Sequence, residues 1–288
     1  MPKKGALPEI SRILAATDLS ARSDRAVERA ILLAKQAGAS LTILHVVDAD
    51  FPSRIADRQA DDARALITDH LTSLPDAKAI GCDIRIVFGK DHCGILDTAD
   101  SMPADLIVLG LHRNETREFF RGTTAERVIR GSAAPVLLVK ARPRAPYRRA
   151  IVAVDLSDCS RPTVEFVARL IPDGELHLRH AFDTPYKAFL TGDEIRREVS
   201  KTHTEQMERF VSRDCARLQS ALAPPAGLFQ VVRQGEVRQM IVEQVERLRP
   251  DLLVVGAHGR SGIAHAMLGS VAEDLLSRPP CDVLAVRP

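Results

Sequence analysis

The sequence predicts an α/β protein made of two similar doubly wound domains that follow one another along the chain. Three observations support this fold class. Short apolar segments rich in β-branched residues alternate with helical segments, and the whole series occurs twice. The apolar segments show little in–out alternation, which is typical of strands buried on both faces of a parallel sheet.

The repetition consists of five blocks that recur in one order. The blocks are RILAATDLS (12–20) with RAIVAVDLSD (149–158), SLTILHVVD (40–48) with ELHLRHAFD (175–183), IRIVFGKD (84–91) with FQVVRQGE (229–236), ADLIVLGLH (104–112) with PDLLVVGAH (250–258), and GTTAERVIRGSAAPVLLV (122–139) with GSVAEDLLSRPPCDVLAV (269–286). The copies are offset by 137 residues at Asp18 and Asp155, and by 147 at Gly122 and Gly269. A period this long exceeds a solenoid repeat and indicates a duplicated domain.

The predicted boundary lies in KARPRAPYRR (140–149), where Pro143 and Pro146 interrupt any helix. We therefore expect domains at 1–141 and 149–288, joined by a linker at 142–148. The arginines of this segment are consistent with an acidic or nucleic-acid partner, or with a solvated connector. We favour the connector, since such charged runs are usually exposed.

The helical segments between the strands carry recognisable boundaries. Residues 23–37 place small and aliphatic side chains along one stripe, and Gly38 stands where a helix C-terminal glycine belongs. Ser160 and Pro162 open the matching helix of the second half. The segments 91–101 and 236–249 are expected to be crossover helices. The stretch 184–222 is polar and mostly helical in pattern.

Composition excludes several classes of protein. The formal net charge is +2, so no global field favours nucleic acid or a membrane surface, and Trp is absent, so stacking platforms for single strands are not expected. The longest apolar runs are too short to span a bilayer, and the N-terminus lacks the apolar core of a secretory signal. The five cysteines form no C-x-x-C pair, which favours a reducing cytoplasm.

The segment GAHGRSGIAHAMLGS (256–270) follows the buried run DLLVV and precedes a helix. Its glycines let backbone amides approach an anion, and a helix N-terminus offers unpaired N–H donors. Ser270 adds a hydroxyl and, with Glu273, forms the pattern of a capping box. The segment therefore predicts a phosphate site, although the same glycines could shape only a loop and Ser270 could only cap the helix.

Ligands of doubly wound sheets bind beyond the carboxyl ends of the strands, at the point where strand order reverses. Asp155 ends the first strand of the second half and is expected to neighbour the glycine segment there. It could contact a ligand, or it could only order its loop. His45 and His180, at equivalent strand ends, are expected to be structural.

Together, V-D-L-S after the first strand, D-L-L-V-V-G in the fourth, and G-x-x-G, nine residues, G-S resemble the universal stress protein family. The resemblance covers nearly the whole chain, twice. It implies a five-stranded, parallel, Rossmann-like domain in each half. It also implies ATP binding where the glycine pattern is kept, with Mg²⁺ able to accompany the phosphates.

The resemblance assigns roles in the second half. Gly256, Gly259, Gly269, Ser270 and Val271 match the phosphate-binding stretch. Asp155 matches an aspartate that approaches the ribose, and Ala181 a position beside the adenine, where its backbone would be the useful group. The resemblance also implies a role in stress response or signalling, an unidentified protein partner, and a homodimer of the fused chain.

The first half departs from this pattern. Its equivalent residues are Asp18, Gly110, Arg113, Gly122 and Thr123. Arg113 replaces the second glycine, and the spacer is one residue shorter and contains two glutamates. We expect the first half to have lost ATP binding or to bind something else, unless Arg113 itself pairs with a phosphate. Thr123 and Glu126 keep the pattern of a capping box.

Other chemistry finds little support. There is no P-loop motif, and no S-G-G-x-D-S motif follows the first strand. No general base is evident beside the glycine segment, so at most a slow ATPase is expected and no catalytic residue is assigned. Asp91, His92 and Cys93 form a compact ligand-type cluster, but a helix cap at Asp91, with His92 and Cys93 as packing or surface residues, explains them better than a metal site.

Overall fold

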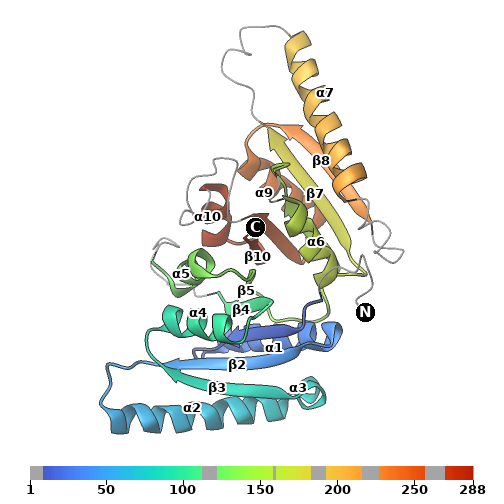
Figure 1. Cartoon of the computed structure of the whole chain (residues 1–288). Coiled ribbons are helices and arrows are strands. Elements are labelled where there is room, and N and C mark those ends of the chain that lie inside the picture. The colour runs from blue at the N-terminus through green and yellow to red at the C-terminus, as the bar shows by residue number, and fades with distance from the viewer. Residues whose placement is uncertain are drawn as a thin grey trace. The chain divides into compact units, whose positions relative to one another are not determined.

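The computed structural model describes residues 9–111, 122–157, 160–182, 193–215, 227–256 and 270–287, apart from the side chains of 193–196, 214 and 270. The chain divides into two compact units. Unit 1 is residues 1–146 with Asp282–Ala285, and unit 2 is residues 147–281 with 286–288. Each unit is an α/β structure with helices on both sides of its strands, as predicted (Figure 1).

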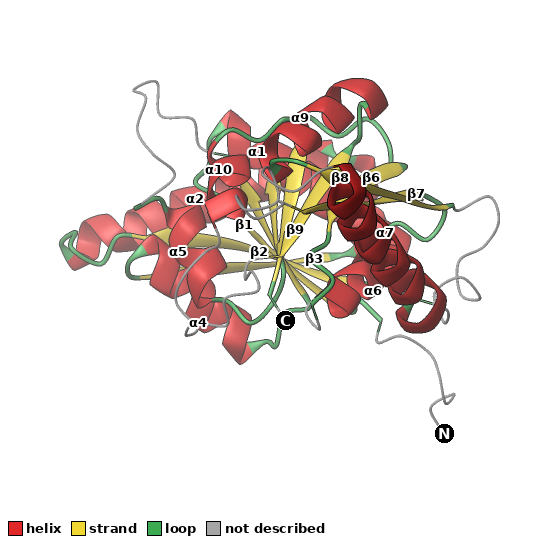
Figure 2. Ribbon diagram, turned by 90° about the horizontal axis from the view of Figure 1, so that it is seen from above, coloured by secondary structure: helices red, strands yellow, loops and turns green. Residues whose placement is uncertain are grey.

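Unit 1 contains a mostly parallel sheet in the order β3-β2-β1-β4-β5-β10. The strands are β1 (Arg12–Ala16), β2 (Ser40–Val47), β3 (Cys82–Phe88), β4 (Leu106–Gly110), β5 (Val136–Val139) and β10 (Asp282–Val286). The helices are α1 (Ala21–Ala37), α2 (Ser53–Ser73), α3 (Pro75–Ile80), α4 (Asp91–Ser101) and α5 (Thr124–Gly131). Helices α1 and α2 lie on one side of the strands, and α4 and α5 on the other (Figure 2).

Unit 2 contains four parallel strands in the order β9-β6-β7-β8. They are β6 (Arg149–Ala153), β7 (Glu175–Phe182), β8 (Leu228–Gln234) and β9 (Leu252–Gly256). The helices are α6 (Ser160–Leu170), α7 (Asp193–Arg209), which continues into a π-helical turn (Phe210–Asp214), α9 (Val237–Leu248) and α10 (Ser270–Ser277). Helices α6 and α7 cover one side and α9 and α10 the other (Figure 2). The reversal of strand order, with β6 between β7 and β9, matches that of β1 in unit 1.

The helix boundaries follow the predicted signals. The Ser20 hydroxyl caps α1 by accepting from the backbone N of Ser23 at 3.4 Å, and Gly38 ends the helix with φ of 66°. The crossover helix α4 covers the predicted residues 91–101, but the expected cap at Asp91 was wrong, because Lys90 is the N-cap residue and no described side chain caps this helix. None of the helices in the described part of the chain is long and apolar enough to cross a membrane.

The recurring Asp of the fourth block anchors neighbouring strands. Asp105 accepts hydrogen bonds from the backbone N of Ser11 and Arg12, at 2.8 and 2.9 Å. In unit 2, Asp251 accepts from the backbone N of Arg148 and Arg149, at 2.9 and 3.0 Å. The aspartate of the repeated D-L-[IL]-V pattern therefore links the amino ends of two neighbouring strands, which is a structural role.

The expectation that all strands are buried on both faces was wrong for β3 and β8. These two strands lie at sheet edges, and most of their side chains are exposed or half-buried. Phe88 and Phe229 are 52% and 46% exposed. An edge strand has a neighbour on one side only, so apolar content alone did not distinguish it from a central strand.

Most side chains of the predicted linker are exposed, although Tyr147 is buried, and the backbone before and within the linker is held against α1. Arg25 donates to the carbonyl of Lys140 at 2.9 Å, and Arg29 to that of Ala145 at 2.8 Å. Arg142 forms an ion pair with Glu28, with Nη2 and Oε1 2.6 Å apart. The part of this segment up to Ala145 is therefore held on unit 1, and one of its arginines, Arg142, is paired with a carboxylate.

Candidate functional site

The carboxyl ends of β6 and β7 in unit 2 are joined through His180. This side chain is 2% exposed, and its Nδ1 lies 2.9 Å from the carbonyl oxygen of Val154. A carbonyl only accepts, so Nδ1 carries the proton. The backbone N of Val154 donates to the carbonyl of Arg179 at 3.0 Å. These bonds fix the position at which the chain leaves β6, immediately before Asp155.

Asp155 shapes the turn between β6 and α6. Its Oδ1 accepts from the backbone N and hydroxyl of Ser157, at 3.0 and 2.5 Å, and from the hydroxyl of Ser160 at 2.8 Å. Leu156, inside this turn, has φ of 61°. A carboxylate that accepts several local donors stabilises such a conformation. The loop-ordering role of Asp155 is therefore visible, while its predicted contact with a ribose stays a prediction.

Unit 1 builds the same turn. Nδ1 of His45 lies 2.8 Å from the carbonyl of Thr17. Oδ1 of Asp18 accepts from the backbone N and hydroxyl of Ser20, at 3.0 and 2.6 Å, and Leu19 has φ of 64°. The expectation that His45 and His180 are structural is confirmed. Because both units keep the histidine and the aspartate turn, these residues do not by themselves indicate a ligand.

Gly110 is required by packing at the end of β4. A Cβ added there would lie 2.9 Å from the carbonyl oxygen of Arg22 and 3.0 Å from Cα of Ser23. The start of α1 therefore approaches this strand end too closely for any larger residue. Gly256 occupies the equivalent end of β9. At this one position of the glycine pattern, the fold supplies a reason for glycine that needs no ligand.

At the start of α5, the backbone N of Gly122 is bound within the first half itself. The hydroxyl of Thr123 accepts from the backbone N of Glu126 at 3.1 Å, which confirms the predicted capping. The carboxylate of Glu126, 6% exposed, accepts from the backbone N of Gly122 and pairs with Nε of Arg130 at 2.7 Å. The Gly122 amide, one of the donors a phosphate would need, is thus bound to a carboxylate.

In unit 2 the structure brings Asp155, Ala181 and Gly256 to one edge of the sheet, because they stand at the carboxyl ends of the neighbouring strands β6, β7 and β9. Val271 lies in the first turn of α10 and is half-buried, and Ser270 begins that helix. Gly259, Gly269, Arg113 and the side chain of Ser270 lie outside the described residues, as does the proposed capping box of Ser270. The phosphate-binding roles therefore stay predictions.

His203 was not predicted to join this edge. It comes from α7, and its Nδ1 lies 3.1 Å from Nε2 of His180. His180 donates through Nδ1, so the contact between the two rings uses its other nitrogen, Nε2. The His203 ring also stacks on Phe182, with centroids 4.2 Å apart and planes at 7°. The only signal in the sequence was the longer segment between the second and third blocks of the second half.

In the described part of the chain, no three His, Cys, Asp or Glu side chains are grouped so that they could hold a metal ion. Sγ of Cys93 lies 3.5 Å from Nε2 of the neighbouring His92 on the exposed first turn of α4.

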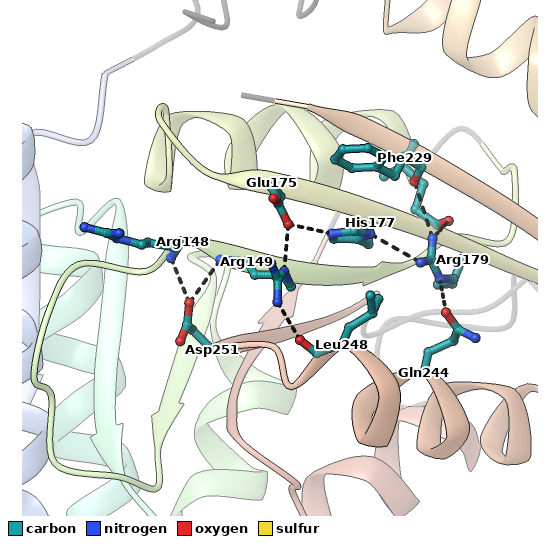
Figure 3. A network of polar contacts seen from close by, with 10 residues as sticks. Arg148, Arg149, Glu175, His177, Arg179, Phe229, Gln244, Leu248 and Asp251 are labelled. Atoms are coloured by element: carbon teal, nitrogen blue, oxygen red, sulfur yellow. Dashed lines mark hydrogen bonds and ion pairs between the residues drawn. The ribbon is translucent and has the colours of Figure 1, made fainter. Parts of the chain in front are cut away.

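A second polar network lies at the opposite, amino end of β6 and β7 (Figure 3). Arg149 donates to Glu175 at 2.7 Å, and Glu175 lies 3.1 Å from Nε2 of His177. Nδ1 of His177 lies 3.3 Å from Nη2 of Arg179, which also donates through Nε to Gln244 at 3.1 Å. The chain of contacts crosses from the exposed start of β7 into the interior beneath α9.

Arg179 is an unusual core residue. It is 4% exposed, and among the described residues it meets no carboxylate within ion-pair distance. Burial lowers the pKa of Arg179 to about 10. Burial also lowers the pKa of His177, whereas the bond from Arg149 lowers the pKa of Glu175. Sequence reasoning missed this network because ELHLRHAF (175–182) was interpreted only as a buried strand.

The fold, together with the aspartate turn that follows the first strand of each unit, defines a tandem protein of two doubly wound α/β domains. Comparison with known proteins narrows this class. The model of the Universal stress protein family matches residues 9–140 and again residues 146–287. The chain therefore belongs to the universal stress protein family and carries two copies of its domain.

Individual relatives agree with this assignment. The chain is 32% identical to Universal stress protein A homolog 2 of Coxiella burnetii over 146 residues, which are 49% of this chain and 95% of that protein. It is 26% identical to Universal stress protein E of Escherichia coli K12 over 227 residues, 72% of this chain and 68% of that protein. A universal stress protein structure from Archaeoglobus fulgidus shares the fold, with a TM-score of 0.68, 18% identity, and coverage of 97% of this chain and 99% of that one.

Proposed function

We propose that this tandem universal stress protein binds ATP, mainly through its second half, and acts in a cytoplasmic stress response. The proposal rests chiefly on the contrast between the two halves. The second half keeps the full glycine pattern between β9 and α10, which lets an anion approach the backbone amides, whereas the first half has Arg113 in place of one glycine. A polyphosphate needs such amides as donors.

Residues of the second half would divide the work of binding. The amides of Gly259, Gly269 and Ser270, with the N-terminus of α10, would hold the phosphates. The carboxyl ends of β6 and β7, at Asp155 and Ala181, would face the nucleoside. Mg²⁺ would enter with the phosphates and need few protein ligands. Whether bound ATP is hydrolysed slowly is a separate question, since no described side chain is assigned as a general base.

The test compares two equivalent substitutions in the intact chain, because Asp282–Ala285 belong to unit 1 and the halves are not independent pieces. Calorimetric titration with ATP and Mg²⁺ is expected to show one high-affinity site per chain. Gly259→Val should weaken it at least about tenfold, or about 1.4 kcal/mol, because a β-branched side chain blocks backbone approach. Arg113→Val, at the equivalent position of the first half, should leave it unchanged. Equal losses from both substitutions would contradict the proposed division.

The competing function is a nucleotide-independent interaction module with a vestigial site. One observation favours it: the Asp155 carboxylate is engaged within its own turn, as Asp18 is in unit 1. Absence of measurable ATP binding by the purified chain, with no nucleotide co-purifying, would support this alternative. The ATPase assay on the wild-type chain and Gly259→Val then decides between binding and slow turnover.

A further inference from the structure

Strand β5 of unit 1 pairs with β10, near the C-terminus of the chain, in an antiparallel and locally symmetric register. Leu137 pairs with Leu284, and the flanking pairs are Val136 with Ala285 and Leu138 with Val283. Leu284 is the repeat counterpart of Leu137, since both stand in the fifth block at the offset of 147 residues. The central pair thus joins a residue to its own copy, as in an interface between identical surfaces.

Backbone pairing alone cannot make β5 choose β10. The two strands read VLLV (136–139) and VLAV (283–286), and both are buried and apolar. A second copy of β5, from another molecule, could adopt the same symmetric register and present almost the same side chains. Partner choice must therefore come from residues beside the strand pair.

An ion pair beside the strands breaks this symmetry. Nε of Arg29 on α1 lies 3.6 Å from Oδ2 of Asp282, and the two side chains are 7% and 2% exposed. The other carboxylate oxygen accepts from the backbone N of Lys140 and Ala141, at 2.8 and 3.2 Å. All these atoms belong to unit 1. Asp282 thus satisfies one buried cation and two backbone donors at the point where β5 ends.

The repeat places other residues at these two positions. In the fifth block, the first copy has Pro135 at the position of Asp282 in the second copy. In the helix after the first strand, the second copy has Phe166 at the position of Arg29 in the first copy. If a second copy of β5 replaced β10, Pro135 would face Arg29. The buried guanidinium would lose its carboxylate, and the amides of Lys140 and Ala141 would lose an acceptor. Removing one partner of a buried ion pair is strongly destabilising.

We propose that the Arg29–Asp282 pair selects the chain's own C-terminal strand as the partner of β5 and rejects a second copy of β5. The surface formed by β5, Arg29 and the amides of Lys140 and Ala141 fits an apolar strand that is preceded by a carboxylate. Of the two strands in the fifth block, β10 is preceded by a carboxylate, Asp282, whereas β5 is preceded by Pro135.

Complementary charge variants of the full chain test this selection. Arg29→Asp alone places two carboxylates together, and Asp282→Arg alone places two cations together. Mixed with each other, the two variants can restore both ion pairs by exchanging their C-terminal strands between molecules. The variants carry different affinity tags, are mixed under mild denaturant and refolded, and are then measured by tandem affinity capture and native mass spectrometry.

The mixture should contain about tenfold more mixed dimer than two differently tagged wild-type chains, a bias of about 1.4 kcal/mol. The double variant Arg29→Asp/Asp282→Arg regains the ion pair within one chain, although not the acceptor for Lys140 and Ala141, and should form mixed dimer at the wild-type level. Recovery of mixed dimer at the wild-type level, with both single variants folded, would overturn the proposal. If neither variant folds alone, they are coexpressed: soluble mixed dimer supports the proposal, and its absence while the double variant folds overturns it.

Discussion

His177 and Arg179 face each other across 3.3 Å, from Nδ1 of the imidazole to Nη2 of the guanidinium. A guanidinium only donates, so His177 accepts through Nδ1 and its single proton stays on Nε2, directed at Glu175. Protonating Nδ1 would replace this bond with two facing donors and place a second cation beside the buried Arg179. This geometry agrees with the lowered pKa of His177.

The first prediction concerns pH. The pKa of His177 is lowered in the folded protein relative to its ordinary value of 6.5, so the folded state binds fewer protons than the unfolded state. The stabilising contribution is complete above about pH 6.5 and declines as pH falls from there through the folded pKa. Chemical denaturation of the full chain, followed between pH 8 and 5, should show this decline. It should be absent from a His177→Thr/Arg179→Leu variant, and an unchanged pH profile in that variant would refute the assignment.

A related prediction uses the first half as a template for the core of unit 2. The aligned blocks place Thr42 and Leu44 where unit 2 has His177 and Arg179. Replacing a buried polar network by apolar residues of similar size is often neutral or stabilising, whereas removing one partner is costly. At pH 7, the triple variant His177→Thr/Arg179→Leu/Gln244→Leu, which removes Gln244 together with its donor, should therefore lose less than about 1 kcal/mol of unfolding free energy. Gln244→Leu alone, which leaves Nε of Arg179 without its acceptor, should lose about 1–3 kcal/mol.

Glu126 should be needed for the stability of α5. Its carboxylate accepts from the backbone N of Gly122 and pairs with Arg130, while it is almost fully buried. Glu126→Ala removes both contacts and should lower the free energy of unfolding by about 1–3 kcal/mol. Glu126→Gln keeps a hydrogen-bond acceptor and should cost less. Urea denaturation measures the free energy of unfolding of each variant. An equal loss in Glu126→Ala and Glu126→Gln would show that the carboxylate makes no specific contribution.

Gly110→Ala should disturb the contact between β4 and the start of α1. The new Cβ would meet the backbone of Arg22 and Ser23 at 2.9–3.0 Å, and backbone atoms cannot rotate away as a side chain does. We expect a loss of about 1–3 kcal/mol, as for overpacked cores. Gly38→Ala is the control, because it meets no atom within 4 Å and should cost about 1 kcal/mol through its φ of 66° alone. A smaller loss for Gly110→Ala than for the control would contradict this packing role.

His203 should hold α7 against the sheet. His203→Ala removes the bond to His180 and the stack on Phe182, whereas His203→Phe can keep the stack. Hydrogen exchange of the amides in α7 should become faster in both variants, and most in His203→Ala. Amides of α1 in unit 1 provide the internal reference. If exchange in α7 were unchanged in His203→Ala, the histidine pair would not secure this helix.

Most of the element order could be predicted from local signals. Helix α1 begins at the serine and ends at the glycine expected of caps, and α4 covers the predicted segment, because these signals act within one turn of backbone. Edge strands were less predictable, since exposure depends on which neighbours a strand has. Asp155 and Ala181 could be placed at one sheet edge from topology, but the three bonds inside the Asp155 turn could not.

The sequence by itself determined the α/β class, the duplication, and the glycine pattern that differs between the halves, because periodicity, repetition and residue type are local properties. Tertiary structure decided which residues are partners. It placed Asp282 beside Arg29 at a separation of 253 positions (282 − 29), and His203 of α7 beside His180. It also attached the Gly122 amide to Glu126. Burial makes such contacts energetically important, and burial depends on the packing of segments that are distant in the sequence.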